Sequence, residues 1–420
     1  MKEIIARIIF KIHSKIRAGL KLSLLESILW PLMVAAGFIY YSLNYLKWAL
    51  YTFKILPPFG PSIFCVSVGN IKIGGTGKSP IVIKLAGAFA NDGHETAIIN
   101  RGYLGPVRGL NVISDGERLL KTIEESSDEA FMEALALIGP KDPLARSEKN
   151  AAIIKRSGCI VSFGENKITG EKGCAVLTAK QRVDCVKHLE DKGFKGICFL
   201  DDAFQYYRLK KNIDIVVLDY GDPFSNGLTF PAGAMRDRLA RLEEADVVII
   251  SKCPPEKRLR EKKVEMIKSI CRKYSFTGNF YESGIEIKGL YSIKEEKAVS
   301  AKELKSRRAY LISAVADNKS VSAAAGALAK AGGFSYFSEG FIDHAGYREA
   351  MQREILRKAA SLGADFIITT FKDAVKLRRD IFEEMPLYAI LSDAWIENES
   401  GLVNEIKKKY ETFSAGKSLK

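Results

Sequence analysis

The fold of this 420-residue chain is decided by one stretch, Ile73-Gly74-Gly75-Thr76-Gly77-Lys78-Ser79-Pro80. It follows an apolar, strand-like run at residues 63–68 and precedes a helical pattern that opens near Pro80. Glycines let the backbone curl so that successive N–H groups point at phosphate oxygens, while the lysine reaches the phosphates and the serine offers a hydroxyl to Mg²⁺. Lys72 stands where the usual pattern has its first glycine. We therefore predict a phosphate-binding loop that consists of Gly74, Gly75, Thr76, Gly77, Lys78 and Ser79.

A second motif lies at the end of another apolar run. Residues 196–200 have the pattern of a buried strand, and the two carboxylates of Asp201 and Asp202 follow it. Ligands of an open parallel sheet gather beyond the carboxyl ends of its strands. We therefore expect both carboxylates to face the same crevice as Lys78 and to hold Mg²⁺ together with Ser79.

The rest of the chain alternates strand-like and helical patterns. The apolar runs at residues 97–99, 213–218 and 247–250 predict an α/β fold, similar to that of P-loop NTPases, in which helices cover both faces of a largely parallel sheet. Extended chain at 280–287 and two further runs, at 309–314 and 366–370, predict a second, smaller α/β domain. The predicted divisions are an N-terminal helical segment at 1–56, a nucleotide-binding domain at 57–285 and a C-terminal domain at 286–420.

The N-terminal segment has the composition of a membrane attachment. Residues 2–21 combine lysines and arginines with isoleucines at helical spacing, which suits the headgroup region of an anionic bilayer. Residues 27–46 carry no charge, and about 20 residues of helix cross a bilayer core. Pro31 and Gly37 dilute this run, so a buried core helix is the alternative. A helix that spans the bilayer and one that lies in its surface both fit the pattern.

The bulk composition narrows the class of protein. A formal net charge of +14 favours anionic partners, which include nucleic acid, an acidic membrane surface and a phosphorylated substrate. The chain contains no aromatic and basic motif typical of nucleic-acid binding, so we expect no nucleic-acid partner. The seven cysteines form no C-x-x-C pair, which favours reduced thiols facing the cytosol. No Asn-Lys-x-Asp run supports guanine selectivity.

Several separated motifs occur in a fixed order around the phosphate loop. They are Val68-Gly69-Asn70, Asn100-Arg101-Gly102-Tyr103, Ser127-Asp128-Glu129-Ala130, Leu200-Asp201-Asp202-Ala203-Phe204-Gln205, Phe230-Pro231-Ala232-Gly233, Met235-Arg236-Asp237, Phe341-Ile342-Asp343-His344 and Thr370-Phe371-Lys372-Asp373-Ala374. Together with the loop, this set resembles the tetraacyldisaccharide 4′-kinase family of the lipid A pathway. The chain departs from the family pattern at Ser127, Ala130, Ala203, Tyr206, Asp237 and Ala345.

The resemblance implies an activity and a setting. The enzyme would use ATP and Mg²⁺ to phosphorylate the 4′-hydroxyl of a tetraacyldisaccharide 1-phosphate, an anionic disaccharide glycolipid. It would work on the cytoplasmic face of the inner membrane of a Gram-negative bacterium, in contact with membrane lipid and with no obligatory protein partner.

The resemblance also implies roles for individual residues. Asp128 would be the base that accepts the proton of the sugar hydroxyl, and His344 would pair with it from the second domain. Lys78 and Arg236 would neutralise charge on the γ-phosphate. Substrate contacts would come from Arg101, Tyr103, Glu129 and Gln205.

An alternative from another class is a membrane-associated P-loop ATPase that acts as a switch or assembly factor. Such a protein would share Lys78, Ser79 and Asp201, but it needs no acceptor base. Asp128 would then be free to vary without loss of ATP turnover.

Overall fold

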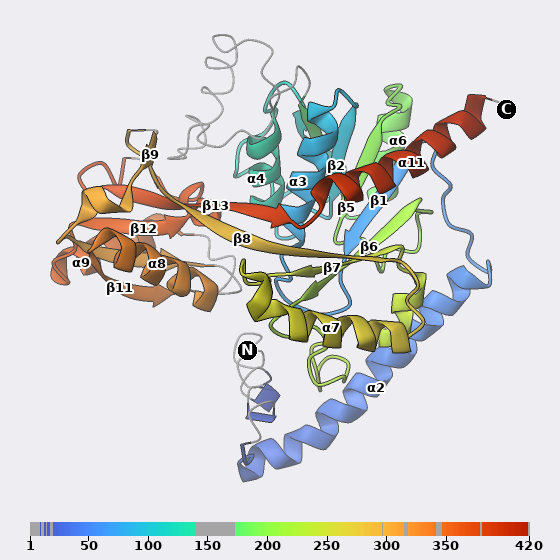
Figure 1. Cartoon of the computed structure of the whole chain (residues 1–420), viewed down its shortest axis with the longest axis horizontal. Coiled ribbons are helices and arrows are strands. Elements are labelled where there is room, and N and C mark those ends of the chain that lie inside the picture. Colours follow the sequence, from blue (N-terminus) through green and yellow to red (C-terminus); the bar gives the residue numbers. More distant parts are fainter. Residues whose placement is uncertain are drawn as a thin grey trace.

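The structure is a computed structural model that describes residues 9, 12–13, 15–16, 20–138, 173–295, 297–314, 318–341, 347–378 and 380–418. Within these residues one sheet of thirteen strands runs through the molecule, in the order β11-β10-β12-β13-β8-β7-β6-β1-β5-β2-β4-β3, with β9 paired to β8 (Figure 1). The strands are β1 (Phe64–Gly69), β2 (Thr96–Asn100), β3 (Asn111–Asp115), β4 (Cys174–Thr178), β5 (Ile197–Asp201), β6 (Ile213–Asp219), β7 (Val247–Ser251), β8 (Asn279–Ser292), β9 (Lys297–Val299), β10 (Arg308–Ser313), β11 (Ser335–Gly340), β12 (Phe366–Thr370) and β13 (Leu387–Ile396).

The half of the sheet that contains β1 is almost entirely parallel. β1 lies between β5 and β6, with Val66 opposite both Phe199 and Ile213, and of the strands in this half described by the structure only β3 runs antiparallel to its neighbour. Strands β1, β2, β5 and β7 are buried along their whole length, which explains their continuous apolar runs. The predicted α/β fold with a largely parallel sheet is confirmed.

Helices cover both faces of this half, as the sequence predicted. The core of one face unites the sheet with α3 (Lys78–Asn91), α4 (Asp128–Leu137) and the C-terminal α11 (Glu399–Ser418). On the other face the strands pack against α6 (Arg182–Asp191), the 3-10 helix η1 (Leu239–Glu244) and α7 (Lys257–Lys273). The sheet thus presents the carboxyl ends of its parallel strands at a single edge.

The strand β8 joins the two halves of the sheet. Its first residues pair in parallel with β7 up to Glu282, and from Ser283 onward it pairs antiparallel with β13. Residue 285, where the sequence predicts a domain boundary, lies just beyond this change of partner, and the division into domains stays a prediction. The second half adds η2 (Ala301–Leu304), α8 (Asn318–Gly332), α9 (Glu349–Ser361) and the short α10 (Phe371–Ala374).

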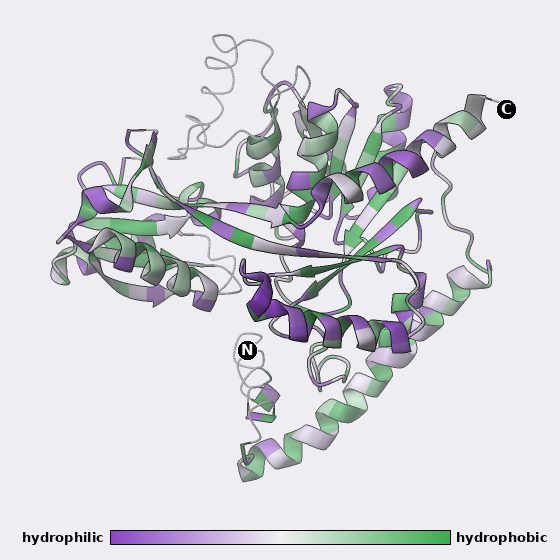
Figure 2. Cartoon of the chain, viewed as in Figure 1, coloured by the Kyte–Doolittle hydropathy of each residue, from purple (hydrophilic) through white to green (hydrophobic). Residues whose placement is uncertain are grey.

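The N-terminal helix α2 (Leu24–Thr52) extends away from the sheet and contains the whole uncharged run 27–46 (Figure 1). A capping box starts it, because the Ser23 N–H donates to the Glu26 carboxylate at 2.7 Å and the Ser23 hydroxyl accepts from the Glu26 N–H. Leu24 and Phe38 are 81% and 68% exposed. Figure 2 shows green, apolar bands along α2 between paler ones. Among the described residues it is the one helix long and apolar enough to cross a membrane. Most of the predicted helix at 2–21 lies outside the described residues.

Candidate active site

The phosphate loop leaves the end of β1 and enters α3, as predicted. Gly74 and Gly77 adopt positive φ angles of 115° and 79°, which residues with a Cβ atom rarely accept, and Gly77 is the N-cap of α3. The helix begins at Lys78, so the prediction of a start near Pro80 was two residues late. The unpaired N–H groups of the first helical turn and the loop therefore face the space in which a phosphate would bind.

Buried hydrogen bonds hold the shape of this loop. Thr76 is buried, its hydroxyl accepts from the Asn70 amide at 3.0 Å, and its carbonyl accepts from the Ser251 hydroxyl at 2.6 Å. The Gln205 amide donates to the Asn70 carbonyl at 2.7 Å. Gln205 therefore braces the start of the loop, and its contact with substrate stays a prediction. Because these partners come from separate strand ends, the loop is fixed before any ligand binds.

The acidic end of β5 lies beside the loop, so Asp201 and Asp202 face the same space as Lys78 and Ser79. The Ser79 hydroxyl donates to Asp201 Oδ2 at 3.3 Å, and Lys78 Nζ lies 3.4 Å from Asp202 Oδ1. Arg236 reaches the same carboxylate through Nη1, at 2.7 and 2.8 Å from the two oxygens of Asp202. Two cations thus converge on Asp202, and the anionic phosphates of a nucleotide would compete for them.

The two neighbouring carboxylates differ in their electrostatics. Burial raises the pKa of Asp201 to about 7, an effect that the Lys78 charge opposes and Glu129 strengthens. Burial also acts on Asp202, but Lys78 and Arg236 outweigh it and hold the pKa of this carboxyl below its usual range. Asp202 is therefore a fixed anion, while Asp201 would gain from a cation beside it.

The residues around Asp201 fit a magnesium ion. Its buried Oδ1 atom has no hydrogen-bond partner, and the Ser79 hydroxyl lies on the other oxygen of the same carboxylate. The described residues contain no cluster of three His, Cys, Asp or Glu side chains that could hold a metal alone. Mg²⁺ in phosphoryl-transfer sites commonly takes one or two protein oxygens and completes its shell with phosphate oxygens and water. One carboxylate and one hydroxyl match that donor set.

A cavity of about 1840 Å³ extends from the phosphate loop toward the second half of the sheet. Besides the loop, Asp201, Asp202 and Arg236, its lining includes Arg101, Tyr103, Glu129 and Gln205, so the structure brings these predicted residues together. Further lining residues that the sequence did not single out are Tyr40, Asn44 and Lys47 of α2, Glu133 of α4, and Val321, Lys372 and Ile390 of the second half. The cavity is large enough for a nucleotide and part of a second substrate.

Asp128 occupies the first position of α4, next to this cavity. Among the cavity-lining residues that the structure describes, Glu129 is present and Asp128 is not. The Asp128 carboxylate is 26% exposed and pairs at 2.7 Å with Nζ of Lys376, a residue that follows α10 in the second half. His344, the predicted partner of Asp128, lies outside the described residues.

Two further polar groups under the site were not predicted. Arg182 is buried and donates through Nη2 to the backbone carbonyls of Asp201 and Asp202, at 2.8 and 2.9 Å. Glu133 is fully buried and accepts from the Asn100 amide at 2.9 Å. Both come from helices whose sequence shows only an ordinary amphipathic pattern. The one signal near them was Asn100, which opens the motif at residues 100–103.

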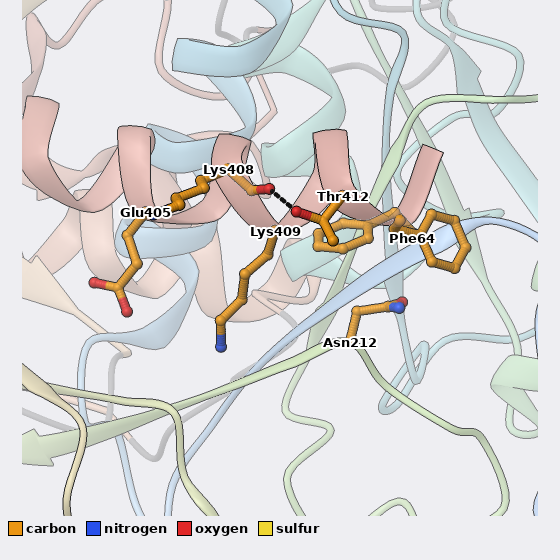
Figure 3. A pocket seen from close by; sticks show the side chains of 7 residues that line it. Phe64, Asn212, Glu405, Lys408, Lys409 and Thr412 are labelled. Carbon is orange, nitrogen blue, oxygen red and sulfur yellow. Dashed lines mark hydrogen bonds between the residues drawn. The ribbon is translucent and has the colours of Figure 1, made fainter. Parts of the chain in front are cut away.

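A second hollow, of about 570 Å³, lies beneath α11 (Figure 3). Phe64, Asn212, Glu405 and Lys409 line it, and the Thr412 hydroxyl there donates to the Lys408 carbonyl at 2.9 Å. Phe64 starts β1, so this hollow is at the amino end of the strand whose carboxyl end carries the phosphate loop. It is separate from the candidate active site.

Comparison with known proteins gives one family. The family model for tetraacyldisaccharide-1-P 4′-kinase matches residues 26–138 and 167–411. The tetraacyldisaccharide 4′-kinase of Desulfotalea psychrophila is 29% identical over 375 residues, which cover 88% of this chain and 92% of the relative. That of Halothermothrix orenii is 29% identical over 353 residues, 81% of each chain.

A solved structure agrees with the fold. LpxK from Aquifex aeolicus, described as an "apo" form in complex with ATP, matches with a TM-score of 0.62 and 20% identity, over 90% of this chain and 98% of its own. This likeness concerns the arrangement of the chain, and the family model carries the assignment of activity. The comparisons favour the kinase over the switch or assembly ATPase. The chain therefore belongs to the tetraacyldisaccharide-1-phosphate 4′-kinase family, as a transferase that phosphorylates a hydroxyl group in lipid A biosynthesis.

Proposed function

We propose that this enzyme takes the γ-phosphoryl group from ATP in the cavity and transfers it to the 4′-hydroxyl of a tetraacyldisaccharide 1-phosphate. The observation that supports this most directly is the convergence of Lys78, Ser79, Asp201 and Arg236 at one end of the same cavity that Arg101 and Glu129 line. The nucleotide and its acceptor would therefore meet in one enclosed space.

The residues at the nucleotide end would each neutralise part of the negative charge of the phosphates. Backbone N–H groups of the loop would bind the phosphate oxygens, and Lys78 would reach the γ-phosphate. Arg236 would leave Asp202 for the transferred group, on which negative charge spreads in the transition state. Ser79 and Asp201 would hold Mg²⁺, which neutralises charge shared by the β- and γ-phosphates.

At the acceptor end, Asp128 would accept the proton of the sugar hydroxyl as that oxygen attacks. A positioned carboxylate is competent for this because the proton leaves late in a loose transition state. Arg101 and Tyr103 would orient the disaccharide, and the cations that line the cavity suit an acceptor that itself carries a phosphate. His344 stays a predicted partner of Asp128.

The setting we propose is the cytoplasmic face of the inner membrane of a Gram-negative cell, with α2 in contact with lipid. Its exposed apolar side chains support this, since Leu25, Ile28 and Leu32 are between 57% and 64% exposed. Replacing these three by serine should shift the protein from sedimented membranes to the supernatant. Full retention on membranes would contradict a lipid contact by this face of α2.

One assay tests the activity. The purified enzyme is incubated with γ-labelled ATP, Mg²⁺ and vesicles that contain tetraacyldisaccharide 1-phosphate, and the label is followed into lipid and free phosphate. We expect label in the lipid at the 4′ position, and no label when the acceptor lacks that hydroxyl. Label that appears only as free phosphate would instead support the switch ATPase.

A further inference from the structure

A buried lysine of the second half of the sheet holds the carboxylate that begins α4. Lys376 Nζ lies 2.7 Å from Asp128 Oδ2, and the lysine side chain is 5% exposed while that of Asp128 is 26% exposed. A buried ammonium group is costly unless it is paired with an anion, so this contact is strongly favoured once the chain has folded. The pair connects two segments that are far apart in the sequence.

The surroundings of Lys376 fix its position. Val375 and Leu377, on either side of it, are fully buried, which anchors the backbone at this point. The carboxylate of Asp373 lies behind it, with Oδ1 3.8 Å from Lys376 Nζ. Asp373 is itself buried and accepts from the Ala314 N–H at 3.0 Å and the Thr370 hydroxyl at 2.9 Å. Lys376 therefore stands between the buried carboxylate of Asp373 and the carboxylate of Asp128.

We propose that Lys376 is a positioning residue for the kinase reaction, an inference that rests on the proposed role of Asp128. Its ion pair holds the Asp128 carboxylate in the orientation in which it can meet an acceptor hydroxyl in the cavity. Among the described residues, Lys372 of this segment lines the cavity but Lys376 does not. Lys376 therefore acts through Asp128 and not by direct contact with a substrate. The contact between the second half of the sheet and α4 thereby determines the orientation of the Asp128 carboxylate.

The test separates positioning from a merely structural role. Lys376→Met should lower kcat about 100-fold, the scale of a misplaced catalytic group, and leave the KM for ATP within about threefold. Lys376→Arg keeps the charge on a longer side chain, so its kcat should lie between that of the parent and that of Lys376→Met. A matched control is Lys84→Met, which breaks the 3.1 Å ion pair of α3 with Glu399 of α11 and should leave kcat unchanged.

A double-mutant cycle supplies the decisive measurement. In an Asp128→Asn background, Lys376→Met should cause no further loss of the residual single-turnover rate, because the lysine then has no base to position. The same fold-loss in both backgrounds, or parental kcat in Lys376→Met, would overturn the inference. If Lys376→Met does not bind ATP because it is unfolded, Lys376→Arg decides, and parental kcat in that variant overturns it. Parental turnover in Asp128→Asn alone would instead refute the base.

Discussion

The two ends of the cavity are built in different ways. At the nucleotide end, Lys78, Ser79 and Asp201 lie at the carboxyl ends of adjacent parallel strands, so two short motifs and one sheet edge define the contacts. At the acceptor end, Asp128 of α4 meets Lys376 of the second half, and nothing in the neighbouring sequence of either residue indicates the other. The nucleotide end thus depends on local sequence, and the acceptor end on how the two halves of the sheet are joined.

This difference predicts different consequences of damage. Substitutions in the loop should affect the affinity for nucleotide as well as turnover, because they remove contacts made in both the ground state and the transition state. Substitutions around Asp128 should affect turnover alone.

Lys78→Ala should weaken ATP binding and lower kcat/KM on the order of 10⁴-fold, because both phosphate attraction and charge neutralisation are lost. Binding of a fluorescent ATP analogue and label transfer to lipid measure the two effects. Lys84→Ala, six residues further along α3, is the control and should behave as the parent. Parental ATP affinity in Lys78→Ala would contradict the loop assignment.

Asp128→Asn should reduce transfer to the lipid roughly 10³-fold while the dissociation constant for ATP stays within about threefold. The amide keeps the shape of the side chain and its place at the start of α4, but it cannot accept the proton. Steady-state kinetics with both substrates varied provide the measurement. If ATP affinity falls as far as turnover does, the two ends of the cavity are not separable in the way we describe.

Arg236→Ala should lower kcat about 100-fold, since one donor to the transferred phosphoryl group is lost. Arg236→Lys should recover only part of the loss, because the shorter lysine side chain lacks the planar guanidinium group, which can donate to two phosphate oxygens from two nitrogens. The ratio of the kcat values of Arg236→Lys and Arg236→Ala, measured at saturating ATP, shows whether the charge of Arg236 or its geometry contributes more to the rate. Equal activity of Arg236→Lys and the parent would leave charge as the sole contribution.

The smallest expected effect concerns Glu133, the buried carboxylate of α4 that lies under the site. Burial, with the charges of Asp201 and Glu129, raises the pKa of Glu133 well above 4.5, so the folded state holds a proton there that the unfolded state releases. The free energy of unfolding contributed by this group is greatest below the unfolded pKa and is lost as the pH rises through the folded pKa. Thermal unfolding of the nucleotide-free enzyme should therefore occur at a lower temperature as the pH rises.

Glu133→Gln tests whether Glu133 causes this pH dependence, since glutamine keeps the contact with the Asn100 amide but does not titrate. We expect the variant to lose about 1 to 3 °C of the pH dependence measured by differential scanning calorimetry. An unchanged pH dependence would assign the effect to other groups.

The same contrast explains what the sequence could reveal. The loop, the acidic strand end and the five strands around β1 follow from periodicity and motif spacing, because each is a local pattern on a sheet buried on both faces. The strands β3, β4, β9, β11 and β13 were missed. β11 has only exposed and half-buried positions. In β13 an apolar run at residues 387–391 is followed by Ser392 and Asp393, so the pattern of a strand does not continue along its length.

Site residues divide in the same way. Family resemblance led to Arg101, Tyr103 and Arg236, and the structure places all three at the cavity. Lys376, Arg182 and Glu133 act through contacts with distant segments, and a single sequence carries no sign of such pairing. Their chemistry becomes visible only when burial shows that each charge or amide needs a partner.

The shared strand β8 has a consequence for how this chain can change in length. β8 pairs in parallel with β7 and antiparallel with β13. Deletion of a single residue near Ser283 would therefore turn every later side chain of β8 to the other face of the sheet. Gly284, where a Cβ atom would come within 2.6 Å of the Trp395 ring, would be replaced there by a larger neighbour. Homologues should therefore vary in length at the loops on either side and keep the residue count of this strand constant.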